Sequence, residues 1–188
     1  FINKLLNINI RKNNKTTDWL NKCHYWKSKY NYENEKKVKK NKIDHYYCVQ
    51  KLSELIPKKS VICTGSSGLA VEIFYTIFKN KYAQRIFLTS GLGSMGYGLP
   101  SSIGACISNN KKPIFLVEGD GSLQQNIQEL AVIKKFKLPI TIFIFNNNGY
   151  CSIKNTQKNY FNKRFLGIDK NSKLYFPDLK KIANAYGI

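Results

Sequence analysis

The chain has 188 residues, of which 43% are hydrophobic and 13% aromatic, which suits one domain with a proper core and an appendage. Its net charge is +20, from 31 basic and 11 acidic residues, but lysine supplies nearly all of the positive charge. Because arginine is expected wherever phosphates or bases are gripped bidentately, this balance argues against nucleic acid as a partner. No apolar run approaches the roughly 20 residues that span a bilayer, and no signal peptide is visible, so no membrane partner is expected.

The cysteines, at positions 23, 48, 63, 106 and 151, are odd in number and form no CxxC pair. This usage argues against a disulfide framework and favours a reducing, cytoplasmic location. Cys23-His24 and His45 with Cys48 could be combined into a zinc site. Their separations do not match a zinc-finger pattern, so incidental occurrence is the favoured interpretation.

Residues 1–43 are rich in Lys and Asn and are interpreted as an appendage. Apolar residues recur at helical spacing from Asp18 to Trp26, which predicts a helix with Asp18 as its N-cap. The charged run 33–42 is interpreted as a linker. The chain starts with Phe1 rather than Met and stops inside a predicted helix and turn from Ile182, so we expect a fragment of a longer protein.

From residue 44 onward, helical and strand patterns alternate. The strands are short and continuously apolar, and each ends in a turn rich in small residues. Helices are predicted over Tyr46–Ile56, Leu69–Phe78 and Gln124–Phe136, and strands over Val61–Thr64, Ile86–Thr89, Ile114–Val117 and Ile140–Phe145. This alternation predicts a three-layer α/β domain with a parallel sheet covered on both faces. The turns lie at the carboxyl ends of the strands, where ligands bind in such sheets.

Gly119-Asp120-Gly121-Ser122 lies directly after a strand and before a helix. Glycines allow close backbone approach, and a helix start offers free N–H groups to an anion. An acidic residue would repel a phosphate beside it unless a cation lay between the two. Asp120 therefore indicates a Mg²⁺ ion that bridges carboxylate and phosphate oxygens. On its own, the motif could equally be an ordinary turn.

Asn146-Asn147-Asn148-Gly149 ends the next strand. Amide and backbone carbonyls are hard oxygen ligands, and neighbouring strands lie about 5 Å apart, so adjacent strand ends can share one cation. Because the chain is rich in asparagine, the run alone could have no functional role.

The pairing of the two motifs across a helix and a strand resembles thiamine-diphosphate enzymes. The stretch 119–150 resembles that family throughout, and Gly93-Ser94-Met95-Gly96-Tyr97-Gly98-Leu99-Pro100 resembles its acetolactate synthase subgroup. The segment 19–30 is similar to the end of that family's central domain. The resemblance implies that residues 1–43 are the end of a central domain and a linker. It also implies that residues 44–188 are a C-terminally truncated domain that binds the diphosphate and Mg²⁺.

The resemblance also implies roles for single residues. Asp120, the Asn147 side chain and the Gly149 carbonyl would bind Mg²⁺, with Asn146 in support. Gly93 would accept a hydrogen bond from the cofactor's pyrimidine amino group, and Met95 would wedge under the cofactor, although Met95 could also be an ordinary core methionine. The other residues implied to contact thiamine diphosphate are Gly65, Ser66, Ser67, Ser94, Gly119, Gly121, Ser122 and Tyr150. Ser66 and Ser67 depart from the Gln-His common in the family, but both can donate hydrogen bonds.

In this family the cofactor carries the chemistry, namely decarboxylation of a 2-oxo acid followed by attack on a second carbonyl compound or protonation. The activating glutamate comes from a pyrimidine-binding domain, usually of a neighbouring subunit, which this chain lacks. The resemblance therefore implies no catalytic residue in this chain, which is expected to be inactive alone. It also implies that the protein is a homo-oligomer and that its substrate is a small 2-oxo acid. FAD could be bound by a region of the protein outside this chain.

The run Tyr150-Cys151-Ser152-Ile153 differs from housekeeping acetolactate synthases and is closer to relatives of unassigned substrate. Cys151, without a base nearby, is not expected to act as a nucleophile. Two rival functions stay open. One is a non-catalytic scaffold or regulatory subunit of the same fold, and the other is a basic nucleic-acid-binding module built on residues 1–43, which would bind in a steeply salt-dependent way.

Overall fold

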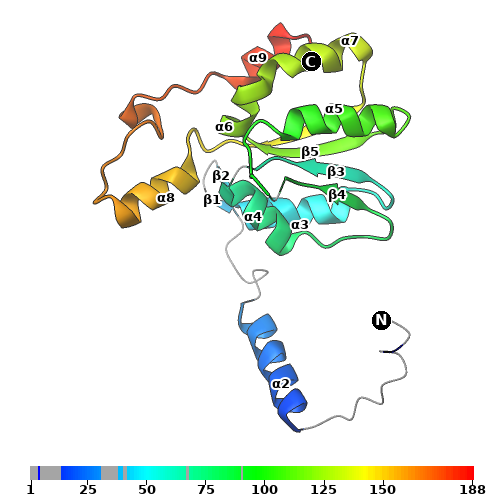
Figure 1. Ribbon diagram of the computed structural model, residues 1–188, viewed down its shortest axis with the longest axis vertical. Coiled ribbons are helices and arrows are strands. Elements are labelled where there is room, and N and C mark those ends of the chain that lie inside the picture. The colour runs from blue at the N-terminus through cyan, green and yellow to red at the C-terminus, as the bar shows by residue number, and fades with distance from the viewer. Residues whose placement is uncertain (1–3, 5–13, 31–37, 40–41, 67, 90) are drawn as a thin grey trace. The chain divides into compact units, whose positions relative to one another are not determined.

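The computed structural model describes residues 4, 14–30, 38–39, 42–66, 68–89 and 91–188 (Figure 1). The chain divides into two compact units, Phe1–Asn41 and Lys42–Ile188, which are described separately. That the first unit is the end of a central domain stays a prediction. Predictions that concern Ser67 and the run 33–37 lie outside the described residues.

The first unit contains the helix α2 (Asn14–Lys29) and the short strand β1 (Val38–Lys39). The rings of Trp19 and Trp26 meet edge to face, with centroids 5.7 Å apart. The helix predicted here is confirmed, but the prediction that Asp18 caps it is wrong. The helix begins upstream at Asn14, because the preceding polar residues continue the helical turn, and Asp18 lies inside it.

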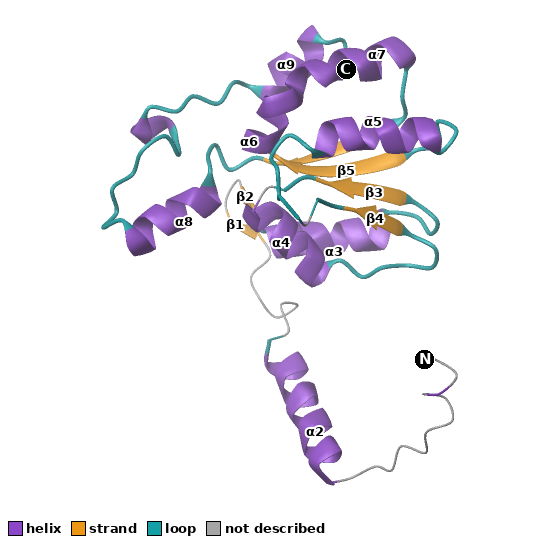
Figure 2. Ribbon diagram, viewed as in Figure 1, coloured by secondary structure: helices purple, strands orange, loops and turns teal. Residues whose placement is uncertain are grey.

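The second unit is built on a four-stranded parallel sheet with the order β4-β3-β5-β6 (Figure 2). Its strands are β3 (Val61–Thr64), β4 (Arg85–Phe87), β5 (Ile114–Gly119) and β6 (Ile140–Phe145). The chain moves from β3 outward to β4 and then returns to the other side of β3 as β5. The strand order therefore reverses between β3 and β5, which is the place where ligands bind in open α/β sheets.

Helices cover both faces of this sheet, so the predicted three-layer α/β fold is confirmed. In Figure 2, α3 and α4 lie below the strands while α5 and α7 lie above them. The remaining elements of the unit are β2 (Lys42–Ile43), α3 (His45–Leu55), α4 (Gly68–Ile77), α5 (Gly98–Ser108), α6 (Asp120–Leu123), the 3₁₀ helix η2 (Gln124–Glu129), α7 (Leu130–Phe136), α8 (Cys151–Tyr160), the 3₁₀ helix η3 (Lys170–Ser172) and α9 (Leu179–Ala185).

The single helix predicted over Gln124–Phe136 is interrupted. Asn126 has non-helical torsions (φ −136°, ψ 32°), which separate a 3₁₀ segment from α7. The cause lies in its side chain, whose Nδ2 donates a hydrogen bond of 2.8 Å to the carbonyl of Gly96. A tertiary contact therefore overrides the helical pattern.

The main core cluster lies between the sheet and the helices above it. Cys63 from β3 and Leu116 from β5 pack with Ile103 from α5 and Ile133 from α7, all of them buried. On the other face, Phe74 of α4 is fully buried and stacks on Phe78 at a centroid distance of 4.5 Å. Buried residues therefore pack against both faces of the sheet.

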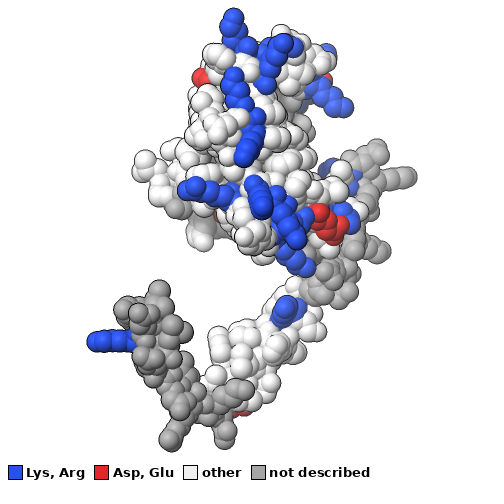
Figure 3. Space-filling model, turned by 90° about the vertical axis from the view of Figure 1, so that its right-hand side faces the viewer, with Lys and Arg blue, Asp and Glu red and all other residues white. Residues whose placement is uncertain are grey.

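Lys and Arg side chains are spread over the face of the molecule shown in Figure 3, with uncharged atoms between them. Few acidic side chains appear on that face. Among the residues that the structure describes, no helix combines the length and the apolar character that a membrane crossing requires.

Candidate cofactor site

The carboxyl ends of three strands meet at one edge of the sheet. Strand register places Thr64 opposite Val117 and Gly119 opposite Phe145, so the turns that follow β3, β5 and β6 are neighbours. The two motifs that the sequence pairs are therefore side by side in the fold. The turn after β5, which carries Asp120, lies at the position where the strand order reverses, and the asparagine motif after β6 lies beside it.

A cavity of about 240 Å³ opens at this edge. Its walls come from the three turns, from the loop before α5 and from the start of α8. The lining residues are Ser66, Gly68, Met95, Gly119, Asp120, Gly121, Ser122, Phe145, Asn147, Gly149, Tyr150, Cys151, Ser152 and Ile153. Nine of the residues that the sequence singles out are thus brought to one cavity.

Asp120 links the two motifs directly. The residue is 3% exposed, and its Oδ1 accepts the N–H of Gly121 at 2.8 Å while its Oδ2 accepts the N–H of Asn148 at 2.6 Å. Burial raises the pKa of the Asp120 carboxyl, and these backbone N–H groups offset part of that rise. A buried carboxylate held at the junction of two strand ends is well placed to meet a cation.

The loop after β6 owes its shape to Asn148. This residue has a positive φ of 57°, which asparagine tolerates better than other side chains, and its N–H also donates to Asn146 Oδ1 at 3.1 Å. The loop leaves Asn147 exposed at the cavity wall with Gly149 beside it. Asn146 is exposed as well and supports the turn by accepting the Asn148 N–H, and its supporting role in Mg²⁺ binding stays a prediction.

The loop that carries Met95 is fastened to the Asp120 turn. The buried Ser122 hydroxyl accepts the N–H of Gly96 at 2.8 Å, and Asn126 holds the carbonyl of the same glycine. Gly96 has a φ of 82°, a conformation that favours glycine. Both polar backbone groups of Gly96 are thus occupied, which places its neighbour Met95 at the cavity.

Two glycines of the cavity lining pack closely against neighbouring groups. A Cβ on Gly121 would lie 2.4 Å from the ring of Tyr150, and one on Gly149 would lie 2.5 Å from the backbone carbonyl of Ile168. The Tyr150 ring is in turn held edge to face by Phe176, with centroids 5.6 Å apart. Glycine is therefore required at both positions by close packing.

Not every expected residue faces the cavity. Gly93 and Ser94 are exposed and lie outside its lining, and Gly65 is buried behind the turn. The N–H of Gly121, expected to point at phosphate, donates to Asp120 in this structure because the carboxylate curls back over the start of α6. Ser67 lies outside the described residues.

Several lining residues carried no assignment to the site in the sequence. Phe145 looked like part of a buried strand, and Ser152 and Ile153 begin α8, which the sequence pattern did not predict. Gly68 starts α4 with a φ of 36° and packs on Ser152, whose Cβ would lie 2.8 Å from a Cβ at position 68. The sequence signals for this wall were its nearness to the asparagine motif and the departure of the run 150–153 from housekeeping acetolactate synthases.

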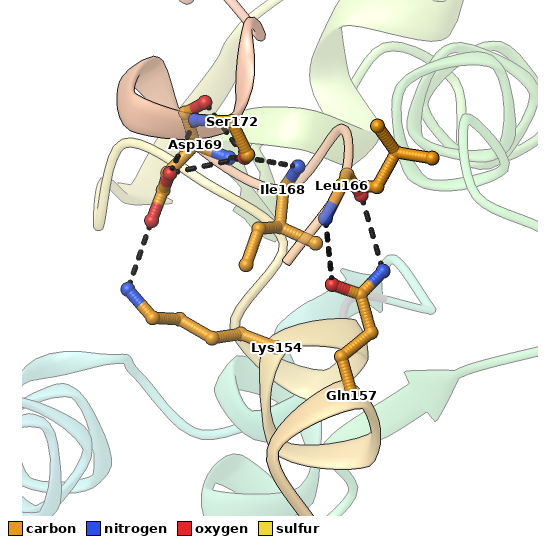
Figure 4. A network of polar contacts seen from close by, with 6 residues as sticks. All are labelled: Lys154, Gln157, Leu166, Ile168, Asp169 and Ser172. Carbon is orange, nitrogen blue, oxygen red and sulfur yellow. Dashed lines mark hydrogen bonds and ion pairs between the residues drawn. The ribbon is translucent and has the colours of Figure 1, made fainter. Parts of the chain in front are cut away.

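A polar network braces the far side of the Gly149 loop (Figure 4). Gly149 forms an isolated antiparallel bridge with Asp169, and the N–H of Tyr150 donates to the carbonyl of Ile168 at 2.8 Å. Asp169 also pairs with Lys154 of α8 at 2.8 Å, and Ser172 Oγ accepts the N–H groups of Ile168 and Asp169. The hydrogen bond from Lys154 lowers the pKa of Asp169, while the same contact raises the pKa of Lys154.

Within this network, Ser172→Ala is expected to cost more stability than Lys154→Met. Ser172 is buried, and its loss leaves the N–H groups of Ile168 and Asp169 without their acceptor, at a cost of about 1–3 kcal/mol. The Lys154–Asp169 pair is open to solvent, so its removal should change little. Urea unfolding of both variants measures the difference, and an equal cost for both would contradict this ranking.

The comparisons with known proteins agree with this geometry. Residues 64–188 match the family described as "Thiamine pyrophosphate enzyme, C-terminal TPP binding domain", thiamine pyrophosphate being thiamine diphosphate. The chain therefore belongs to the thiamine-diphosphate enzymes and contains their C-terminal cofactor-binding domain.

Within that family the chain is similar to acetolactate synthases. It is 33% identical over 181 residues to the acetolactate synthase large subunit of Cyanidium caldarium, covering 93% of this chain and 29% of the relative. It is 31% identical over 158 residues to the chloroplastic acetolactate synthase 2 of Zea mays, covering 81% and 24%, and 33% identical over 146 residues to that of Brassica napus, covering 76% and 23%. The chain thus spans about a quarter of the length of these relatives.

Proposed function

We propose that this chain is the diphosphate- and Mg²⁺-binding half of a thiamine-diphosphate-dependent 2-oxo acid decarboxylase or carboligase resembling acetolactate synthase. The observation that carries the proposal is the Asp120 carboxylate, which joins the end of β5 to the asparagine loop after β6 inside the cavity. The proposal rests as well on the likeness to acetolactate synthases.

The donor set suits a hard divalent cation. Asp120 offers a carboxylate oxygen, Asn147 an amide oxygen and Gly149 a backbone carbonyl, all of which are ligands that Mg²⁺ accepts. Within the described part of the chain, no three His, Cys, Asp or Glu side chains gather as a metal-binding group. Mg²⁺ held here would therefore depend on diphosphate oxygens and water to complete its coordination.

When bound, thiamine diphosphate supplies a nucleophilic ring carbon that adds to the carbonyl of a 2-oxo acid and accepts the electrons released with carbon dioxide. The residues of this chain would bind and orient it. Asp120, Asn147 and Gly149 would hold the diphosphate through the cation, and Met95 would support the cofactor from the loop that Ser122 fastens. Tyr150, Cys151 and Ile153 would form the wall that excludes water beside it.

We also propose that a pyrimidine-binding domain, of the same or a neighbouring subunit in a homo-oligomer, covers the loop before α5 and contributes the activating glutamate. Leu92 on that loop is 94% exposed, and such a side chain suits a surface that a partner covers. The 188-residue chain alone should then turn over no 2-oxo acid. Turnover of pyruvate by the purified chain, followed as carbon dioxide release, would contradict this proposal.

Calorimetric titration of the chain with thiamine diphosphate, with and without Mg²⁺, tests the binding function. The expected result is binding that requires the cation. If the chain shows no binding, the same titration on the full-length protein decides. Failure there would reject the proposed cofactor site in favour of the non-catalytic scaffold of the same fold.

A further inference from the structure

Glu118 is a fully buried carboxylate that the proposed function does not use. It lies in β5 two residues before Asp120 and has 0% exposure. Charged side chains are seldom buried so completely without a structural or functional reason. Its Oε1 accepts the N–H of the next residue, Gly119, at 3.0 Å.

The carboxylate of Glu118 is seated against the backbones of two glycines. A Cβ on Gly65 would lie 1.8 Å from Oε1, and a Cβ on Gly98 would lie 2.1 Å from Oε2. Real Cβ atoms do not approach other atoms so closely, so Glu118 occupies the space that side chains at these two positions would need. The contact therefore explains why both positions hold glycine.

These two glycines lie behind different walls of the cofactor site, next to residues that line it. Gly65 begins the turn that continues to Ser66, and its N–H donates to the carbonyl of Val117 at 3.0 Å. Gly98 is the first residue of α5 and follows the loop that carries Met95. The first N–H groups of a helix carry partial positive charge, which favours a carboxylate at that end.

We infer that Glu118 is a positioning residue of the cofactor site. Its carboxylate, held between the backbones of Gly65 and Gly98, sets the spacing between the turn after β3, the start of α5 and the Asp120 turn. This inference rests on the proposed function, because the effect that it predicts is on diphosphate binding. An apolar side chain of the same size would fill the space but offer Gly119 no acceptor.

The first test compares Glu118→Gln with Glu118→Met, at a temperature where circular dichroism shows both folded. Calorimetry measures the Kd of inorganic diphosphate in the presence of Mg²⁺. Glu118→Gln keeps the shape and the acceptor and should bind within about threefold of the parent chain, whereas Glu118→Met should bind about tenfold more weakly or worse. Equal affinity of the methionine variant and the parent would overturn the inference.

The second test needs no bound ligand. Gly65→Ala should lower the melting temperature, and adding Glu118→Ser to it should restore part of the loss because the clash is removed. Gly104→Ala is the matched control, since a Cβ there meets nothing within 4 Å. If the two substitutions changed the melting temperature in a strictly additive way, the inferred contact between Glu118 and Gly65 would be wrong. If neither the parent chain nor the full-length protein binds magnesium diphosphate, the proposed function fails. The stability test still decides whether the Glu118 carboxylate packs against Gly65.

Discussion

Replacing Asp120 with alanine should weaken Mg²⁺-dependent binding of thiamine diphosphate by about two orders of magnitude. Among the described residues that line the cavity, Asp120 alone carries a carboxylate, and losing a buried charged partner costs about 2–5 kcal/mol or more. Near 3 kcal/mol, the Kd for thiamine diphosphate would rise about 100-fold. The Asn148 N–H would also lose its acceptor at Oδ2, so the asparagine loop should shift as well. Calorimetry with and without Mg²⁺ measures the effect.

Two control variants separate the role of the charge from a loss of folding. Asp18→Ala removes an exposed carboxylate of α2, outside the cofactor-binding unit, and should leave binding unchanged. Asp120→Asn keeps an oxygen that can accept a backbone N–H but removes the charge, so it should fold well and still bind weakly. If Asp120→Asn bound as tightly as the parent chain, a bridging cation at this position would be ruled out.

The strands of the sheet, and the meeting of the two motifs at one edge of it, could be predicted because both depend on sequence patterns within and directly after each strand. Val61–Thr64 and Ile140–Phe145 are continuous apolar runs, and the structure gives them the predicted bounds. Once the strands are parallel, their carboxyl ends share one edge, and the motifs after β5 and β6 must meet there. Hence Asp120 and Asn147 could be paired from the sequence alone.

Helices α5 and α8 could not be predicted in this way. Gly98, Pro100 and Gly104 lower the helix propensity of α5, whose helical form depends on burying Leu99 and Ile103 against the sheet. In α8, polar residues occupy most positions and no residue is buried, so no apolar periodicity marks it. Tertiary packing in one case and local polar contacts in the other decide the structure.

The finer geometry of the site depends on contacts between segments far apart in the sequence. The kink at Asn126 follows from its hydrogen bond to Gly96, and the turn of the Gly121 N–H toward Asp120 follows from the burial of that carboxylate. Glu118 appeared in the sequence only as a residue beside a motif. Its position between two glycines required the strand register and the start of α5 together.

Replacing Gly149 with alanine should disrupt the loop 146–149 after β6 without changing a charged group. The added methyl would lie 2.5 Å from the carbonyl oxygen of Ile168, which is backbone and cannot rotate away. The bridge to Asp169 and the 2.8 Å hydrogen bond from the Tyr150 N–H would then have to open. Overpacking of this kind costs about 1–3 kcal/mol, so the melting temperature should fall.

The same substitution should weaken Mg²⁺-dependent binding of thiamine diphosphate by about tenfold or more, because the Gly149 carbonyl moves with the loop. Gly91→Ala is the matched control, since a Cβ at that loop position meets nothing within 4 Å and its effect on binding should be small. Scanning calorimetry and titration calorimetry on both variants separate stability from affinity. A stable Gly149→Ala variant with unchanged affinity would show that the bridge to Asp169 does not hold the loop. A destabilised variant with unchanged affinity would instead remove the Gly149 carbonyl from the ligands proposed for Mg²⁺.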